Sequence, residues 1–131
     1  MKTKILIVDD NPDLCHILQT HLELLGDDSI LAVNAKEAVE LATSQVPDPI
    51  VMEIMLPVMD GLQATPLIRE HLNTQSTPIL AMTAKVTSED KEECLRSGCD
   101  DYISKPFTSK QLTSNIEKLL DQKSSLSTFR P

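Results

Sequence analysis

Four short apolar segments of the sequence are each followed by side chains whose types suit metal or phosphate chemistry. Carboxylates gathered at one place repel one another, and a cation relieves that repulsion. Carboxylate oxygens are hard ligands suited to Mg²⁺. A nearby lysine can bind a carboxylate or a phosphoryl oxygen, and a threonine hydroxyl can hydrogen-bond to an anion. The residues concerned are Asp9, Asp10, Glu53, Thr83 and Lys105.

Each of these features has an ordinary structural explanation when it is taken alone. An Asp-Asp pair after a strand is usually a turn or a helix cap, and Lys105-Pro106 is typical of a surface turn. Their placement after four separate apolar segments is much harder to explain by turns and caps. The combination therefore favours a functional site.

Five short apolar segments are predicted to be the strands that position these side chains. Continuous apolar runs of this length are typical of strands buried on both faces, as in parallel sheets. The five segments are 5–8, 30–33, 50–52, 79–82 and 102–103. In an open parallel sheet, functional residues lie at the carboxyl ends of the strands, where the candidate residues fall.

Five amphipathic segments between and after these strands are predicted to be helices. Asn11 with Pro12, and the pair Thr108 and Gln111, are typical helix-start signals. The other helices are predicted to begin near Asn34, after Gly61 and near Thr87-Ser88. The alternation predicts an α/β domain with helices on both faces of the sheet. That domain spans 1–121, and 122–131 is expected to be a flexible tail or a truncated linker.

Composition excludes several classes of protein. The 131 residues contain 12 Lys and Arg against 20 Asp and Glu, a formal net charge of −8, which argues against nucleic acid or an anionic membrane as partner. No apolar run approaches the roughly 20 residues that span a bilayer. The three cysteines show no Cys-x-x-Cys spacing. We expect a cytoplasmic domain without disulfides.

Four motifs together resemble the receiver domain of two-component response regulators, in a single-domain form like the chemotaxis regulators. The motifs are ILIVDDNP at 5–12, MEIMLPVMDG at 52–61, MTAK at 82–85 and DYISKPF at 101–107. The resemblance covers residues 4 to about 121. It implies a flavodoxin-like (βα)5 fold with strand order 2-1-3-4-5. It also implies a domain that is not an enzyme and that receives a phosphoryl group from a histidine kinase or a His-containing phosphotransfer protein.

The resemblance implies a Mg²⁺ site and assigns its ligands. Asp10 would be the direct acidic ligand, with Asp9 acting beside it through water. Glu53, at the acceptor position, would be a further ligand, and the backbone carbonyl of Met55 would complete the set.

The resemblance also assigns the residues that respond to phosphorylation. Thr83 would be the switch hydroxyl, and Tyr102 the aromatic that turns inward with it. Lys105 would pair with the acceptor or the phosphoryl group, aimed by a cis bond to Pro106. A downstream effector would bind the face formed by the fourth helix, the fifth strand and the fifth helix.

The acceptor position departs from the family pattern, because Glu53 stands where the family has the phosphorylated aspartate. Two interpretations remain open. Glu53 is either a standing imitation of the phosphorylated state or a substitution that silences the site. The alternative to a phosphorelay receiver is a phosphorylation-independent pseudo-receiver that acts as an adaptor.

Overall fold

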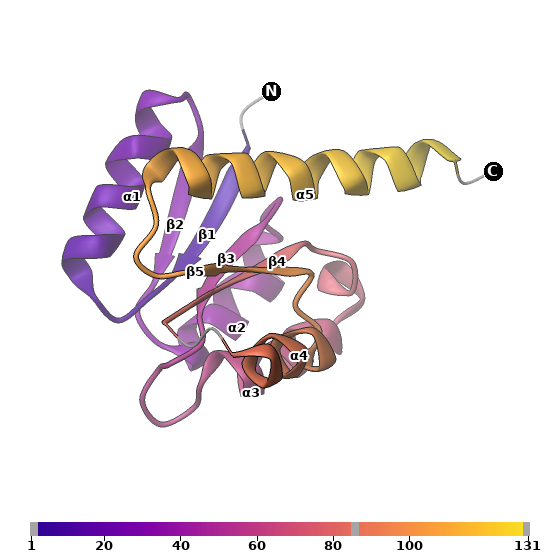
Figure 1. Ribbon diagram of the computed structural model, residues 1–131. Coiled ribbons are helices and arrows are strands. Elements are labelled where there is room, and N and C mark those ends of the chain that lie inside the picture. The colour runs from indigo at the N-terminus through magenta and orange to yellow at the C-terminus, as the bar shows by residue number, and fades with distance from the viewer. Residues whose placement is uncertain (1–2, 85–86, 130–131) are drawn as a thin grey trace.

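Five parallel strands form the centre of the molecule. The computed structural model describes residues 3–84 and 87–129, so Lys85 of the MTAK motif lies outside the described residues (Figure 1). The strands are β1 (Lys4–Val8), β2 (Asp28–Ala32), β3 (Ile50–Glu53), β4 (Ile79–Thr83) and β5 (Asp101–Ser104). They pair in the order β2-β1-β3-β4-β5, each parallel to its neighbour. The predicted flavodoxin-like order is confirmed.

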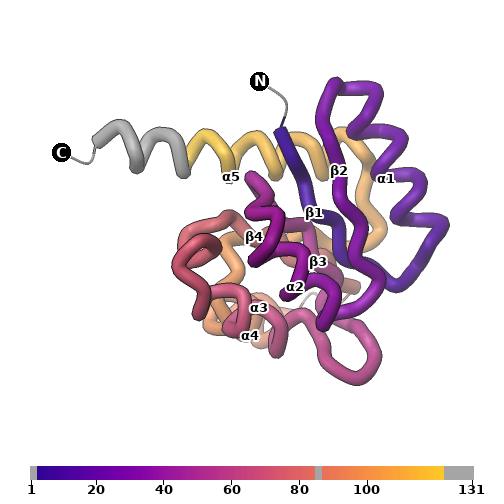
Figure 2. The backbone as a smooth tube through the Cα atoms, turned by 180° about the vertical axis from the view of Figure 1, so that it is seen from behind, coloured from indigo at the N-terminus to yellow at the C-terminus, as the bar shows by residue number. Residues whose placement is uncertain are grey.

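Helices cover both faces of the sheet (Figures 1 and 2). They are α1 (Pro12–Leu24), α2 (Ala35–Gln45), α3 (Gly61–Arg69), α4 (Ser88–Ser97) and α5 (Ser109–Phe129), with a short 3₁₀ helix at Leu72–Thr74. Successive strand side chains point to opposite faces. Ile5 and Ile7 therefore pack with α1 and α5, whereas Leu6 and Val8 pack with α2, α3 and α4. Two apolar cores result, one on each side of the sheet.

The predicted helix starts are confirmed by side-chain caps. Asn11 accepts hydrogen bonds from the first-turn amides of α1, and Asn34 does the same for α2. Thr87 and Asp90 form a reciprocal capping box at α4. Thr108 exchanges the equivalent two hydrogen bonds with Gln111 before α5. These contacts satisfy amide groups that a helix start otherwise leaves unpaired.

Most strand ends differ from the sequence prediction by a residue or two, and two differences concern side chains or segments that were assigned differently. β2 ends at Ala32, and Val33, predicted to be in the strand, is half exposed. The segment expected to be a tail from Gln122 is helical as far as Phe129. Residues 121–129 contain neither proline nor glycine, so nothing in that sequence stops the helix. Arg130 and Pro131 of that segment lie outside the described residues.

Arg69, the last residue of α3, ties the end of that helix to two other segments. Its guanidinium donates to the carboxylate of Asp100 at 2.9 Å, and the same carboxylate oxygen accepts from the Ile79 amide at 2.8 Å. The carbonyl oxygens that Arg69 reaches are those of Thr74, Gln75, Thr77 and Gly98. Only a planar fork with several donors can serve so many acceptors at once.

Candidate functional site

Lys105 lies between two carboxylates at the carboxyl ends of the strands. Its ammonium nitrogen is 2.9 Å from Asp9 Oδ2 and 2.8 Å from Glu53 Oε1. Asp9 follows β1, Glu53 ends β3 and Lys105 follows β5, so the parallel sheet brings three distant positions together. The Asp9 side chain is only 1% exposed and that of Glu53 10%, whereas Lys105 is 23% exposed.

The remaining carboxylate oxygens are held by backbone amides. Asp9 Oδ1 accepts from the Asn11 amide at 2.9 Å, and Glu53 Oε2 accepts from the amide of Ile54 at 2.8 Å. A buried charge is tolerated when it is both paired and hydrogen-bonded. Both carboxylates meet that condition, although Asp9, Glu53 and Lys105 together keep one net negative charge.

Two opposing effects act on the pKa of Lys105. Burial lowers it, because the charged form loses solvation, while the hydrogen bonds and negative charges of Glu53 and Asp9 raise it. The second effect prevails, and the pKa of Lys105 is raised above its ordinary 10.5. Lys105 is therefore fully charged at neutral pH.

The backbone around Lys105 follows the sequence prediction. The bond between Lys105 and Pro106 is cis, and the Lys105 amide donates to the Thr83 carbonyl at 2.9 Å. Thr83 is 2% exposed. Tyr102 is half-buried, with the Lys91 ammonium 4.9 Å from its ring centroid. The switch roles of Thr83 and Tyr102 stay predictions.

Two of the predicted metal ligands, Asp9 and Glu53, lie together around Lys105. Asp10 is exposed, in contrast to Asp9. Within residues 3–84 and 87–129, no three His, Cys, Asp or Glu side chains are arranged to hold a metal ion. The oxygen donors have the chemistry that Mg²⁺ prefers, but Asp9 and Glu53 are bound to Lys105. In this arrangement a lysine balances the charge that a metal would otherwise balance.

The loop after β3 packs tightly beneath this site. A Cβ atom at Gly61 would lie 2.6 Å from the carbonyl oxygen of Glu53. The Gly61 amide also donates to the Ile54 carbonyl at 2.9 Å, and Asp60 caps α3. Only glycine allows this approach, which explains the Asp60-Gly61 pair of the second motif.

Sequence reasoning missed a groove beside Thr83, on the α3 side of α4. Asp90 and Glu93 of α4 line it together with Leu62 of α3. Acidic residues on a helix are typical of a solvated face, and nothing in the sequence indicates that Asp90 and Glu93 border a hollow. The only available signal was the density of acids at 89–93.

The domain's family is decided by comparison with known proteins. The family model of the response regulator receiver domain matches residues 5–117. The chain belongs to this family. It is thus a receiver domain of two-component signal transduction.

Similar proteins carry such receiver domains within longer chains. The domain is 38% identical over 120 residues to the alkaline phosphatase synthesis transcriptional regulatory protein PhoP of Bacillus subtilis, covering 92% of this chain and 49% of PhoP. It is 45% identical over 118 residues to hybrid signal transduction histidine kinase G of Dictyostelium discoideum, covering 88% of this chain and 3% of the kinase. The chain thus spans half or less of the length of these relatives.

Solved receiver structures share the fold. The receiver domain of the sensor histidine kinase PA1611 from Pseudomonas aeruginosa, with magnesium coordinated in its active-site cleft, has a TM-score of 0.85 and 36% identity, covering 92% of this chain and 99% of that one. A CheY-like receiver domain protein from Methanospirillum hungatei has a TM-score of 0.88 at 24% identity, covering 95% and 98%, and supports the fold alone. No helix of the described part of this receiver has the length and apolarity needed to cross a membrane.

Proposed function

We propose that this receiver domain signals through protein–protein contacts, and that Glu53, held by Lys105, makes the acceptor position silent to phosphoryl transfer. The observation that carries the proposal is the 2.8 Å contact between Lys105 Nζ and Glu53 Oε1. The pair neutralises the charge at the acceptor position within the domain itself. On this proposal the domain is a phosphorylation-independent adaptor and not an enzyme.

The chemistry of Glu53 supports this view of the acceptor position. Glutamate has one methylene more than aspartate, so its carboxylate is displaced from where an aspartate would attack phosphorus. Misplacement by about 1 Å in such sites costs roughly 10²-fold in rate. Both oxygens of Glu53 are also already bound, one by Lys105 and the other by the Ile54 amide.

Magnesium fits the proposal as a weak ligand. Asp9, Asp10, Glu53 and the Met55 carbonyl would hold it, and its charge would relieve the repulsion among the carboxylates. Lys105 competes for two of those carboxylates, which supports weak binding.

The proposed partners are proteins. A histidine kinase or a His-containing phosphotransfer protein would dock at the crevice of Lys105, and a downstream effector at the α4–β5–α5 face. Support comes from family membership and from the relatives, one a transcriptional regulator and another a hybrid kinase.

The three cysteines are buried and unpaired among the described residues, the state expected in a reducing cytoplasm.

NMR of Thr83 and Tyr102 tests the proposal. We compare the natural chain with Glu53→Gln and Glu53→Asp, the last with and without Mg²⁺ and beryllofluoride. A substitution shifts a two-state equilibrium only by its differential interaction with the two states. We expect the Thr83 and Tyr102 signals of the natural chain and of Glu53→Gln to match those of the untreated Glu53→Asp variant. The opposite result would be signals of the natural chain that are shifted toward those of the beryllofluoride-treated Glu53→Asp variant, while the signals of Glu53→Gln are not. That result would show that Glu53 imitates phosphorylation.

A further inference from the structure

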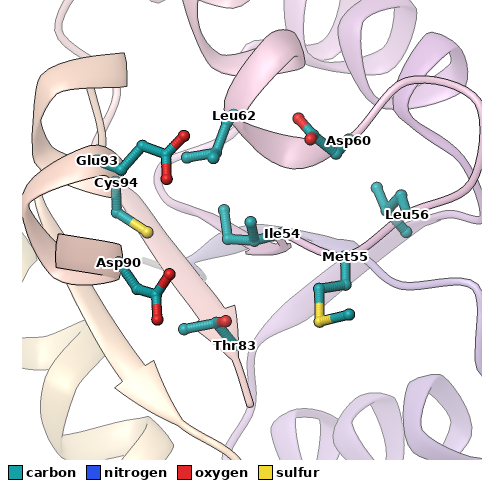
Figure 3. Close-up of a pocket in the computed structure, with 9 residues that line it drawn as sticks. All are labelled: Ile54, Met55, Leu56, Asp60, Leu62, Thr83, Asp90, Glu93 and Cys94. Atoms are coloured by element: carbon teal, nitrogen blue, oxygen red, sulfur yellow. The ribbon is translucent and has the colours of Figure 1, made fainter. Parts of the chain in front are cut away.

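A groove of about 440 Å³ separates α4 from α3 and the loop after β3 (Figure 3). Its apolar lining includes Ile54 of the loop, Leu62 of α3 and Cys94 of α4. Ile54 is 5% exposed and Cys94 2%. Burial, with Cys99 nearby, raises the pKa of the Cys94 thiol to about 11. Cys94 is therefore neutral at physiological pH and acts as a small apolar surface.

Three carboxylates surround this apolar floor. Asp60 lies at the start of α3, while Glu93 points from α4 toward Leu62 of α3 and Asp90 points toward Thr83 (Figure 3). Asp60 and Asp90 accept hydrogen bonds as helix caps, which leaves their charge in place. Glu93 is exposed.

No positive side chain of the described residues offsets these charges. Within residues 3–84 and 87–129, none of the three carboxylates has a lysine, arginine or histidine nitrogen within 4 Å. Lys91, the cation of α4 nearest in sequence to Asp90 and Glu93, lies over the Tyr102 ring on the β5 side of the helix. Among the described residues, the groove thus combines an apolar floor with a negative rim that no cation pairs.

We propose that this groove binds a basic amphipathic segment of a partner protein. An apolar side chain of that segment would cover Ile54, Leu62 and Cys94, while flanking lysines or arginines would face the acidic rim. An apolar centre within a polar rim is the common anatomy of protein interfaces. Complementary charge accelerates such encounters and selects among partners.

The chemistry favours a peptide segment over a metal ion or a small molecule. The acidic side chains lie around the rim and no three converge on one point, as a metal site requires. Small-molecule sites orient their ligand with a few buried polar groups, whereas Glu93 is exposed and Asp60 and Asp90 are half exposed. This surface also differs from the α4–β5–α5 face expected to bind an effector, because it lies on the α3 side of α4.

The test uses two synthetic peptides and ¹⁵N-labelled protein. One peptide of about 14 residues carries a leucine face and a lysine face, long enough to form a helix on binding. Its counterpart has glutamate in place of lysine. At roughly 50 mM salt, where surface charges are weakly screened, we expect the lysine peptide to shift the amide signals of Leu62, Thr83 and Cys94. The glutamate peptide should leave them unchanged.

Matched variants separate the groove from the general acidity of the chain. Asp90→Asn with Glu93→Gln removes two charges at the rim, while Glu23→Gln with Glu40→Gln removes two exposed charges on α1 and α2. We expect the rim variant to weaken binding roughly fivefold or more, and the control less than about twofold. Equal weakening by both variants, or shifts spread over every acidic face, would overturn the proposal.

Sedimentation without peptide tests a second copy of the chain as occupant. We expect a monomer for the natural chain and for both variants. A dimer that is lost only in the rim variant would assign the groove to self-association and overturn the partner proposal.

Discussion

Lys105 and Arg69 are both partly buried cations, but they stabilise the molecule in different ways. Their side chains are 23% and 20% exposed, and each joins segments far apart in the sequence. Lys105 contacts two carboxylates. Arg69 contacts one carboxylate and four backbone carbonyls, those of Thr74, Gln75, Thr77 and Gly98.

The difference lies in what the partners can do. Carbonyl oxygens do not titrate, so the contacts of Arg69 with them do not change with pH. Carboxylates titrate and exchange one cation for another. Lys105 and Arg69 are therefore alike in burial and charge. The candidate site differs from a structural contact because it lies at the carboxyl ends of the strands and because the partners of Lys105 are carboxylates.

Loss of Arg69 is expected to give the largest change in stability. Arg69→Met removes one donor from Asp100 and from four carbonyls, of which Asp100 and Thr74 keep a backbone amide donor. We expect a loss of about 3–4 kcal/mol in the free energy of unfolding. Urea denaturation measures it. Arg69→Lys should recover less than half of the loss, because one ammonium cannot span these acceptors. Full recovery by lysine would show that charge alone suffices at Arg69.

Loss of Lys105 is expected to give a smaller effect that depends on pH. Lys105→Met leaves Asp9 and Glu53 buried side by side, and we expect a loss of about 2–3 kcal/mol at pH 7. Protonation of one carboxylate in the folded variant should restore part of this stability as the pH falls to about 5. Arg69→Met should show no such recovery. A flat pH profile for Lys105→Met would contradict the comparison.

The natural chain offers the complementary test at high pH. The pKa of Lys105 is raised in the folded state, so its contribution to stability is complete below its ordinary 10.5. That contribution is lost as the pH rises through the folded-state value. We expect the alkaline decrease in stability of the natural chain to exceed that of Lys105→Met, measured by urea denaturation from pH 9 upward. If the stability of the natural chain and that of Lys105→Met fall in parallel as the pH rises, the ion pair adds no stability.

The two neighbouring aspartates give the smallest expected effects. Asp9→Asn weakens one contact of Lys105 and should cost about 1–2 kcal/mol. Asp10 is exposed, so Asp10→Asn should change stability by less than about 0.5 kcal/mol. Thermal unfolding of the two single variants measures the difference in their stability. Equal effects would show that both aspartates act in the same way.

The sequence predicted the fold well, because each strand was a continuous apolar run and each helix began at a capping residue. The resemblance to receiver domains implied that Lys105 pairs with the acceptor or with a phosphoryl group, and the structure shows its pairing with Glu53. The contact of Lys105 with Asp9 was not predicted, because adjacent acids after a strand do not indicate which one points inward. Arg69 was missed since backbone carbonyls carry no sequence signature. The continuation of α5 to Phe129 was not predicted, because residues beyond Gln122 lack both an apolar pattern and a helix breaker.

Phosphorylation by acetyl phosphate with Mg²⁺, followed by intact-mass spectrometry, tests most directly whether the Glu53–Lys105 pair replaces phosphoryl transfer. Glu53→Asp restores the side-chain length of the family's acceptor, and we predict that this variant gains the mass of one phosphoryl group. The natural chain should gain it at least roughly 10²-fold more slowly. A phosphorylated natural chain, modified at Glu53 at a rate close to that of Glu53→Asp, would contradict the account.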